Sequence, residues 1–466
     1  MPVTTMTSNP LTEIRIETPI GPITAPLETL SESLSFLANK VRKTDKVDQS
    51  IEEFLGNGDD STEFSIESKR KFYFDRSYVF WMEAFMGVIE KSWNIVKVEN
   101  YNHGENRTAP VWFDERVGDR VIKVPHKLIM FVEHKTHSNT RFVTTFTPYD
   151  EYEVDVMTQF RSDVFDYSRF HEDHENYFYQ QGSLKGAHFD ASYQMLDAPE
   201  MDWDAIIIKP EDRHVLDRNL TRFIDSVGLF QSKGLRSSRG VLLTGPPGTG
   251  KTLTCKVLIN QLTSATVIYV ARDSITDVGQ ITALYKMARK LAPSVVILED
   301  IDTLGGLSRE DADHPVLGEF LNCLAGVEDN HGVVTLATTN HPEKLDWALT
   351  DRPGRFDVRL DFGYPDEKHR ENILSKYLTP FKTGKVNLSR IAKDTDKFTG
   401  AYLQEIIQSA FMLAHEECDY CEEPVINQSH LDMALSHIKT QREVVGREKN
   451  LAYADSGTAS SYDLYG

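Results

Sequence analysis

The sequence predicts an α/β protein with a parallel-sheet core, a small helical lid and a separate α/β domain in front of them. Four short apolar, β-branched runs, "RGVLLTG", "TVIYVA", "SVVILED" and "GVVTLATTN", alternate with helical segments in residues 199–364. This alternation indicates parallel strands that helices cover on both faces. Residues 365–447 have a mostly helical pattern, which is typical of a lid, and residues 448–466 are rich in Ser, Ala and Gly, so we expect a flexible tail.

The chain changes character near residue 70. Residues 1–69 are polar and rich in Thr, Ser and acids, so we expect a partly flexible segment. In the domain predicted over 70–198, apolar residues at helical spacing predict a helix over Ser77–Trp93. Lys127–Glu133 and Arg141–Thr147 flank a polar turn and predict a hairpin. We expect this domain to bind a partner.

Composition narrows the classes of function. The chain of 466 residues carries 51 Lys and Arg against 71 Asp and Glu, a net charge of −20. This charge argues against nucleic acid or anionic membrane as a partner, because phosphate attraction dominates such binding. No run approaches the roughly 20 apolar residues that span a bilayer. The start lacks the order of a secretory signal, and four cysteines are too few for a disulfide scaffold, so we expect a cytoplasmic protein.

A glycine-rich motif follows the first strand of the core. "GPPGTGKT" fits G-x-x-x-x-G-K-[ST], with a strand before it and a helix after it. The glycines let backbone N–H groups approach phosphate oxygens, and the helix adds the positive end of its dipole. Lys251 should reach the β- and γ-phosphates, and the Thr252 hydroxyl should bind Mg²⁺. The predicted nucleotide-binding residues here are Gly245, Pro246, Pro247, Gly248, Thr249, Gly250, Lys251, Thr252 and Leu253.

Two adjacent acids end the strand in "SVVILED". A phosphate-loop site needs one carboxylate near Mg²⁺ and another that orients or deprotonates the attacking water. Glu299 comes first, so it takes the metal position, through a coordinated water, and Asp300 takes the water-activating position. Neighbouring strand residues point to opposite faces, so the two acids cannot share one role. The commoner order is Asp before Glu, and modest backbone or water shifts absorb the difference of one methylene at each position.

Through these motifs, residues 200–445 resemble an AAA ATPase. Leu336–Asp357, "LATTNHPEKLDWALTDRPGRFD", resembles the second region of homology of that family. The resemblance assigns Asn340 to the sensor-1 position, which positions the lytic water. It assigns Arg352 and Arg355 to the arginine-finger positions, which stabilise charge on the γ-phosphate of a neighbouring subunit. It therefore implies ATP hydrolysis by a homo-oligomeric ring, usually a hexamer, with Mg²⁺.

The lid extends the resemblance. "FTGAYLQEII" is similar to the start of the family's sensor-2 helix, where Gly400 and Ala401 pack against adenine. Tyr377 stands where many members contact ribose with His, so nucleotide affinity or selectivity should differ. The Leu-Glu-Asp-Ile-Asp order and "TTNHPEKLD" are most similar to the subgroup that contains the mitochondrial Rieske-protein translocase, which keeps the inverted acids. The N-terminal membrane helix of that subgroup is not matched, so the resemblance does not imply a mitochondrial membrane role.

The sequence says less about the process that ATP hydrolysis would drive. Members that thread peptides carry an aromatic residue where "TDVGQI" has Asp277, so we expect remodelling of a folded protein partner rather than threading. Three alternatives stay open. They are a nucleotide-dependent scaffold or switch with little turnover, a proteasome-associated ring that docks through Leu464-Tyr465-Gly466, and an ATPase on DNA, which the charge disfavours.

Two segments of the sequence contain possible metal ligands. His415, Cys418 and Cys421 lack the second pair of ligands of a structural zinc site, so we interpret them as the end of a lid helix. "FHEDHENYF" supplies His171, Asp173 and His174, which we interpret as a solvated polar segment.

Overall fold

The structure is a computed structural model. It describes residues 13–18, 21–26, 46–56, 65–73, 76–102, 106–148, 153–197, 199–271, 274–275, 279–303, 315–325, 330–350 and 354–455. The chain divides into two compact units, Met1–Ser183 and Leu184–Gly466, and each is described by itself.

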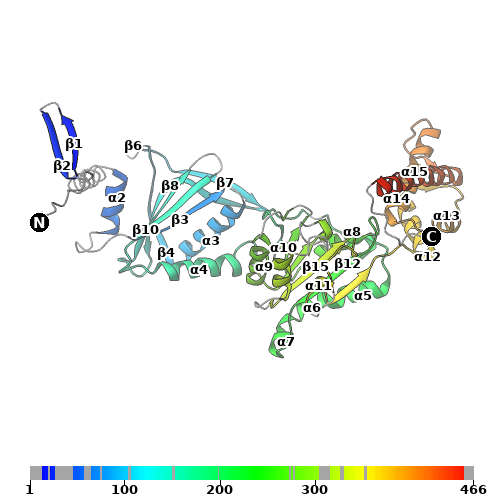
Figure 1. The fold of residues 1–466 in the computed structure, drawn as a ribbon, viewed down its shortest axis with the longest axis horizontal. Helices are drawn as coiled ribbons and strands as arrows, with labels where there is room; N and C mark the ends of the chain where they lie inside the picture. Colours follow the sequence, from blue (N-terminus) through cyan, green and yellow to red (C-terminus); the bar gives the residue numbers. More distant parts are fainter. Residues whose placement is uncertain are drawn as a thin grey trace, which may run out of the picture. The chain divides into compact units, whose positions relative to one another are not determined.

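An antiparallel sheet forms the centre of the first unit (Figure 1). Its strand order is β3-β10-β9-β8-β4, with β7 paired to β8. The strands are β3 (Ser65–Tyr73), β4 (Trp93–Glu99), β7 (Val111–Val117), β8 (Arg120–His134), β9 (Arg141–Pro148) and β10 (Glu153–Phe160). The smaller elements are the hairpin of β1 (Glu13–Thr18) and β2 (Gly21–Pro26), and the pair β5 (Tyr101–Asn102) and β6 (Asn106–Arg107).

Helices pack on both faces of this sheet. α2 (Lys46–Leu55) buries Ile51 and Leu55 against Phe131 of β8 and Val143 of β9. α3 (Arg76–Ser92) and α4 (Tyr167–Gln180) contact each other, and Phe85 of α3 meets Phe142 of β9 edge to face. The predicted helix over 77–93 is therefore confirmed as α3, and the predicted hairpin as β8 and β9. The partner-binding role of this unit stays a prediction.

The second unit contains a six-stranded parallel sheet with the order β11-β13-β14-β15-β12-β16. The strands are β11 (His188–Asp190), β12 (Arg239–Thr244), β13 (Thr266–Val270), β14 (Ser294–Leu298), β15 (Val333–Thr339) and β16 (Val358–Asp361). The four predicted strands are β12 to β15, which confirms the α/β class. β11 pairs with β13, so the core sheet begins before residue 198, where we expected the preceding domain to end.

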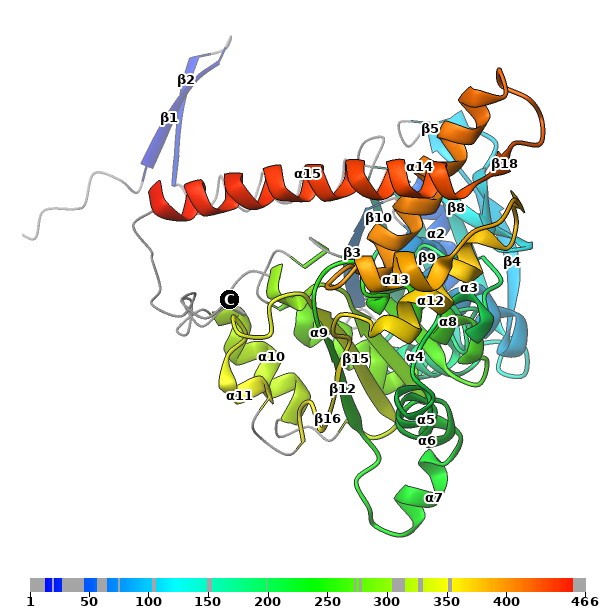
Figure 2. The same cartoon turned by 90° about the vertical axis from the view of Figure 1, so that its right-hand side faces the viewer.

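Helices cover both faces of the parallel sheet, as Figure 2 shows for β12 and β15. One face packs on α5 (Pro210–Asn219), α6 (Thr221–Asp225) and α8 (Lys251–Gln261) through a core that includes Ile297 and Cys255. α9 (Gln280–Lys290) and α10 (Pro315–Ala325) lie on the other face, where the Tyr285 hydroxyl and the Thr335 hydroxyl are 2.9 Å apart. The remaining short helices are η1 (Trp203–Ala205), α7 (Val227–Ser232), η2 (Ile301–Thr303) and α11 (Trp347–Thr350).

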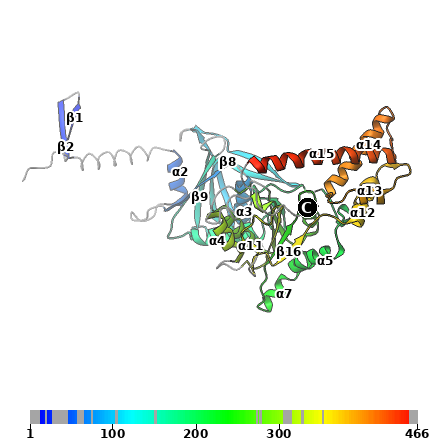
Figure 3. The ribbon, with the colours of Figure 1, turned by 45° about the vertical axis from the view of Figure 1, so that its right-hand side comes forward.

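A helical lid follows the sheet. It consists of α12 (Glu367–Leu378), α13 (Leu388–Asp394), α14 (Gly400–Glu417) and α15 (Gln428–Asp455), with a short pair of strands, β17 (Lys382–Thr383) and β18 (Val425–Ile426). The lid has its own hydrophobic core, which includes Leu374, Leu403 and Leu431. Figure 3 shows α15 running past the other lid helices, and it continues to Asp455, beyond the predicted end at 447. Among the described residues, none of the helices is both long and apolar enough to cross a membrane.

Candidate functional site

The loop between β12 and α8 has a backbone that requires glycine. Gly245, Gly248 and Gly250 have φ angles of 136°, 79° and 104°, in the left-handed region that L side chains rarely adopt. A Cβ atom on Gly245 would lie 2.2 Å from the Phe362 carbonyl oxygen, and one on Gly248 would lie 2.9 Å from Ala401 Cβ. α8 begins directly after this loop, and no side chain caps its N-terminus. Its first N–H groups are therefore available to an anionic ligand.

Lys251 is a buried cation inside this loop. Its Nζ donates to the carbonyl oxygens of Gly245 at 2.6 Å and Pro246 at 2.9 Å. Burial lowers the pKa of Lys251 below its usual range, and the charges of Asp300 and Asp302 offset part of this effect. A glycine cradle, an uncapped helix and a buried lysine together fit a phosphate chain.

The two acids at the end of β14 have different surroundings. Glu299 accepts a hydrogen bond from the Tyr269 hydroxyl on β13, 2.8 Å from its Oε2. Asp300 instead lines the cavity above the phosphate loop. Its φ angle is 49°, a conformation that Asp tolerates better than Glu because its short side chain bonds locally. The backbone therefore gives a physical reason for Asp as the second acid of the inverted pair.

Asn340 holds the Asp300 carboxylate. Asn340 follows β15, and its Nδ2 donates to Asp300 Oδ1 at 2.9 Å. The backbone N–H of Asn340 donates to Asp302 Oδ1 at 3.1 Å, and the Thr339 hydroxyl donates to the same oxygen at 2.6 Å. The backbone N–H of Asp300 donates to the Thr338 hydroxyl at 2.9 Å. Asp302 and Thr338 thus join the site, although we did not predict roles for them from the sequence.

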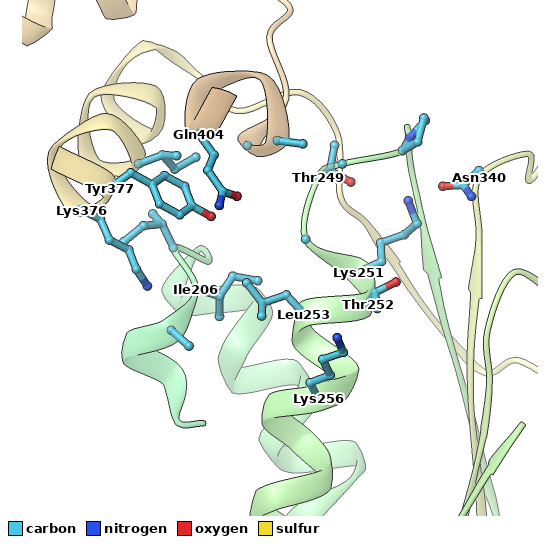
Figure 4. A pocket seen from close by; sticks show the side chains of 18 of the residues that line it. Ile206, Thr249, Lys251, Thr252, Leu253, Lys256, Asn340, Lys376, Tyr377 and Gln404 are labelled. Atoms are coloured by element: carbon cyan, nitrogen blue, oxygen red, sulfur yellow. The ribbon is translucent and has the colours of Figure 1, made fainter. Parts of the chain in front are cut away.

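A cavity of about 440 Å³ lies between the phosphate loop and the lid (Figure 4), within the usual range of roughly 300–1,000 Å³ for small-molecule sites. Tyr377 of α12 and Gln404 of α14 project into it from the lid, opposite Leu253 and Ile206. Burial raises the pKa of Tyr377, so its phenol is neutral. The predicted residues that line the cavity are Pro247, Gly248, Thr249, Gly250, Lys251, Thr252, Leu253, Asp300, Asn340, Gly400 and Ala401.

Sequence reasoning missed part of this cavity. Ala205, Ile206 and Ile207 form its apolar wall, and they precede the first strand that we predicted in the core. The signal was the apolar run "AIII" just before Lys209. Gln404, within the quoted sensor-2 segment, was missed as well. Gly245 and Pro246 line a neighbouring open cleft that also contains Asn340.

Arg355, one of the two predicted arginine fingers, is not among the residues that line this cavity within one chain. The Arg355 guanidinium donates to the backbone carbonyl oxygen of Ala348. Arg352 lies outside the described residues, as do Asp277 and the C-terminal Leu464-Tyr465-Gly466. Their predicted roles stay predictions.

The cysteine pair in the lid lies at the end of α14, as predicted. Cys418 and Cys421 are joined by a disulfide, a pairing that we did not predict. His174 is buried on α4 and its ring contacts the Trp81 carbonyl oxygen at 3.0 Å, so the expected solvated segment is wrong at this residue. In the ranges that the structure describes, no group of three or more His, Cys, Asp or Glu side chains is placed to hold a metal ion.

The fold and the cavity define a nucleotide-binding protein of the phosphate-loop class. The loop at the end of β12, the acids after β14 and Asn340 after β15 meet at the carboxyl edge of one parallel sheet, where such folds bind ligands. Residues 241–364 match the family model described as "ATPase family associated with various cellular activities (AAA)". The match identifies residues 241–364 as an AAA ATPase domain.

Three curated proteins illustrate the relationship. The chain is 31% identical over 287 residues to the ATP-dependent zinc metalloprotease YME1L of Drosophila melanogaster. The aligned residues cover 58% of this chain and 38% of that protein. It is 30% identical over 261 residues to the ATP-dependent zinc metalloprotease FtsH of Mycoplasmopsis pulmonis, 52% of this chain and 35% of that protein. It is 33% identical over 267 residues to FtsH 1 of Petrotoga mobilis, 53% of this chain and 40% of that protein. The chain spans less than half the length of these relatives.

Proposed function

We propose that this protein is an Mg²⁺-dependent ATPase that assembles as a ring and uses ATP hydrolysis to remodel or translocate a protein partner. The observation that carries the proposal is the cavity in which Lys251, Asp300 and Asn340 meet beneath the lid residues Gly400 and Ala401. The names of the relatives describe ATP-dependent enzymes, which supports ATP as the nucleotide.

In the proposed reaction, water attacks the γ-phosphorus of ATP, and ADP leaves as inorganic phosphate forms. Lys251 neutralises charge on the β- and γ-phosphates, and the backbone N–H groups of the loop and of α8 cradle them. Asn340 engages Oδ1 of Asp300, so Oδ2 accepts the proton of the attacking water. The left-handed backbone at residue 300 and the hydrogen bond from its N–H to the Thr338 hydroxyl fix the position of the backbone that carries this carboxylate.

The residues present fit a Mg²⁺ ion beside the phosphates. Thr252 follows Lys251 on the first turn of α8, and Glu299 has one oxygen, Oε1, that is buried and has no hydrogen-bond partner among the described residues. A buried carboxylate oxygen without a partner is costly, so a cation or its coordinated water is the expected neighbour. When held by Thr252 and Glu299, the ion would neutralise charge that develops on the phosphates during transfer.

The proposed ring is a hexamer whose active sites lie between subunits. In it, Arg352 and Arg355 of one subunit would complete the site of the next, and the domain over 70–198 would recruit the protein partner. Cytoplasmic location remains our prediction for the compartment.

Steady-state phosphate release tests this proposal. We expect ATP-dependent release by the wild-type chain, loss of release in EDTA, and a mass in light scattering that increases to that of a ring when ATP is added. A nucleotide-dependent scaffold would bind ATP without appreciable release, and this result would contradict the proposed hydrolysis. Stimulation by DNA at low salt would instead favour the DNA-directed alternative.

A further inference from the structure

We propose that Tyr269 is a positioning residue for the Mg²⁺ site, because its hydroxyl fixes one oxygen of Glu299 and leaves the other for the metal or its water. This inference rests on the proposed function, since it concerns the metal that accompanies the nucleotide. It explains how Glu can serve at the first acidic position, where the shorter Asp is commoner.

The sheet places Tyr269 beside Glu299. In the parallel register of β13 and β14, Tyr269 pairs with Ile297, two residues before Glu299. Side chains two residues apart on a strand share a face, so Glu299 continues the face of Ile297 that packs on α8. The Tyr269 hydroxyl reaches along this face and donates to Glu299 Oε2 at 2.8 Å.

The other oxygen of Glu299 is the second observation. Oε1 is buried and has no hydrogen-bond partner within the described part of the chain. The same carboxylate therefore has one oxygen that the protein satisfies and one that it does not. Leaving a buried charged acceptor unpaired costs free energy, so this arrangement is expected where an added ligand completes it.

α8 brings the predicted metal ligand Thr252 toward the same carboxylate. Glu299 lies close enough to Cys255 to interact electrostatically with its buried thiol. Thr252 is three residues before Cys255, and residues at this spacing are neighbours on a helix surface. Glu299, directly after β14, and Thr252, on α8, therefore approach one region from two sides.

The role of the hydroxyl follows from the length of Glu. Its side chain has one more rotatable bond than that of Asp, so a free Glu would lose more conformational entropy on binding the ion. A hydrogen bond to Oε2 removes part of this freedom before the ion arrives. Partners of this kind orient metal ligands and strengthen metal binding in other sites.

The test is the Mg²⁺ requirement for binding a non-hydrolysable ATP analogue, measured by titration calorimetry on the full chain. Tyr269→Phe keeps the aromatic side chain and removes the hydroxyl. We expect the half-saturating Mg²⁺ concentration to increase on the order of tenfold, the low end for loss of an outer partner of a metal ligand. Affinity for the analogue in EDTA should not change, because the contacts of the loop with phosphate do not involve Tyr269.

Tyr285→Phe is the matched control. It also removes a buried hydroxyl contact in the same unit, the 2.9 Å contact with Thr335, but on the opposite face of the sheet. We expect it to lower thermal stability and to leave the Mg²⁺ requirement unchanged. Glu299→Asp is the second variant, because Asp is too short to keep the bond to Tyr269, and its requirement should increase as well.

The double variant Glu299→Asp with Tyr269→Phe should show no more than the increase of Glu299→Asp alone. Equal Mg²⁺ requirements for Tyr269→Phe and Tyr285→Phe would overturn the inference, as would additive shifts in the double variant. If Tyr269→Phe does not fold, an unchanged requirement in Glu299→Asp overturns it. Wild-type binding that is the same in Mg²⁺ and EDTA would instead remove the metal from the proposed function, and the inference with it.

Discussion

Replacing Asn340 by Ala isolates one contact of the proposed catalytic centre. The amide donates to Asp300 Oδ1 at 2.9 Å, and the substitution removes it. The backbone N–H of residue 340, which donates to Asp302 at 3.1 Å, is kept, so the end of β15 should stay in place. A hydrogen bond to a charged group contributes about 1.5–3 kcal/mol. At about 1.4 kcal/mol per tenfold, hydrolysis should slow roughly 10- to 150-fold.

The assay is steady-state phosphate release at saturating ATP, with nucleotide affinity measured in parallel. Nucleotide affinity should change little, because Asn340 positions Asp300 and is not one of the residues that we expect to bind the phosphates. Asn260→Ala is the control, since Asn260 lies on α8 and donates to the backbone carbonyl oxygens of Pro199 and Lys256 at 3.1 and 3.0 Å. If Asn340→Ala hydrolyses ATP as fast as Asn260→Ala, the proposed positioning of Asp300 is wrong.

Three further predictions concern the loop and the first unit. Lys251→Ala should abolish binding of a fluorescent ATP analogue, and near-normal affinity would contradict its role. Gly248→Ala adds a Cβ atom to a residue with a φ of 79°, and this atom would lie 2.9 Å from Ala401 Cβ. The resulting strain of about 1–2 kcal/mol should weaken nucleotide binding roughly 5- to 30-fold in the same assay. Unchanged affinity would contradict this close approach of the loop to the lid. Burial alone would raise the pKa of Glu99, but hydrogen bonds and nearby cations, with Ser50 first, lower it overall. This stabilisation is complete above the ordinary Glu pKa of about 4.3 and is lost as the pH falls through the lowered pKa of Glu99. Glu99→Gln should therefore lower the melting temperature at pH 7, and its difference from the wild type should shrink as the pH falls below about 4.3; a constant difference would contradict this.

The sequence predicted the core strands and the phosphate loop because their signals are local. β12 to β15 are continuous apolar runs, as expected for strands that are buried on both faces. The glycine motif fixes its own conformation, since three left-handed residues and close backbone approaches exclude other side chains. The acidic pair indicated Asp300, and the family resemblance indicated Asn340; their hydrogen bond was not predicted, although the carboxyl ends of parallel strands meet at one edge of a sheet.

Other features depend on contacts between distant segments. β11 has three residues, and its place in the core sheet follows from pairing with β13, which no local pattern indicates. Ile206 becomes part of the nucleotide cavity because the segment that precedes β12 in the chain passes beside the phosphate loop. The partnership of Tyr269 with Glu299 requires the register of two strands. The disulfide between Cys418 and Cys421 was missed because composition weighs cysteine number and not local geometry.

In the proposed reaction Asp300 activates the attacking water in spite of the inverted acidic pair. Asp300→Asn tests it most directly, because Asn keeps the shape of the side chain, tolerates the left-handed backbone and retains an oxygen that can accept the hydrogen bond from Asn340. Phosphate release and ATP affinity should be measured on the same preparation of the full chain. We expect ATP affinity close to that of the wild type and phosphate release slower by at least about 100-fold. Phosphate release at the wild-type rate would contradict it.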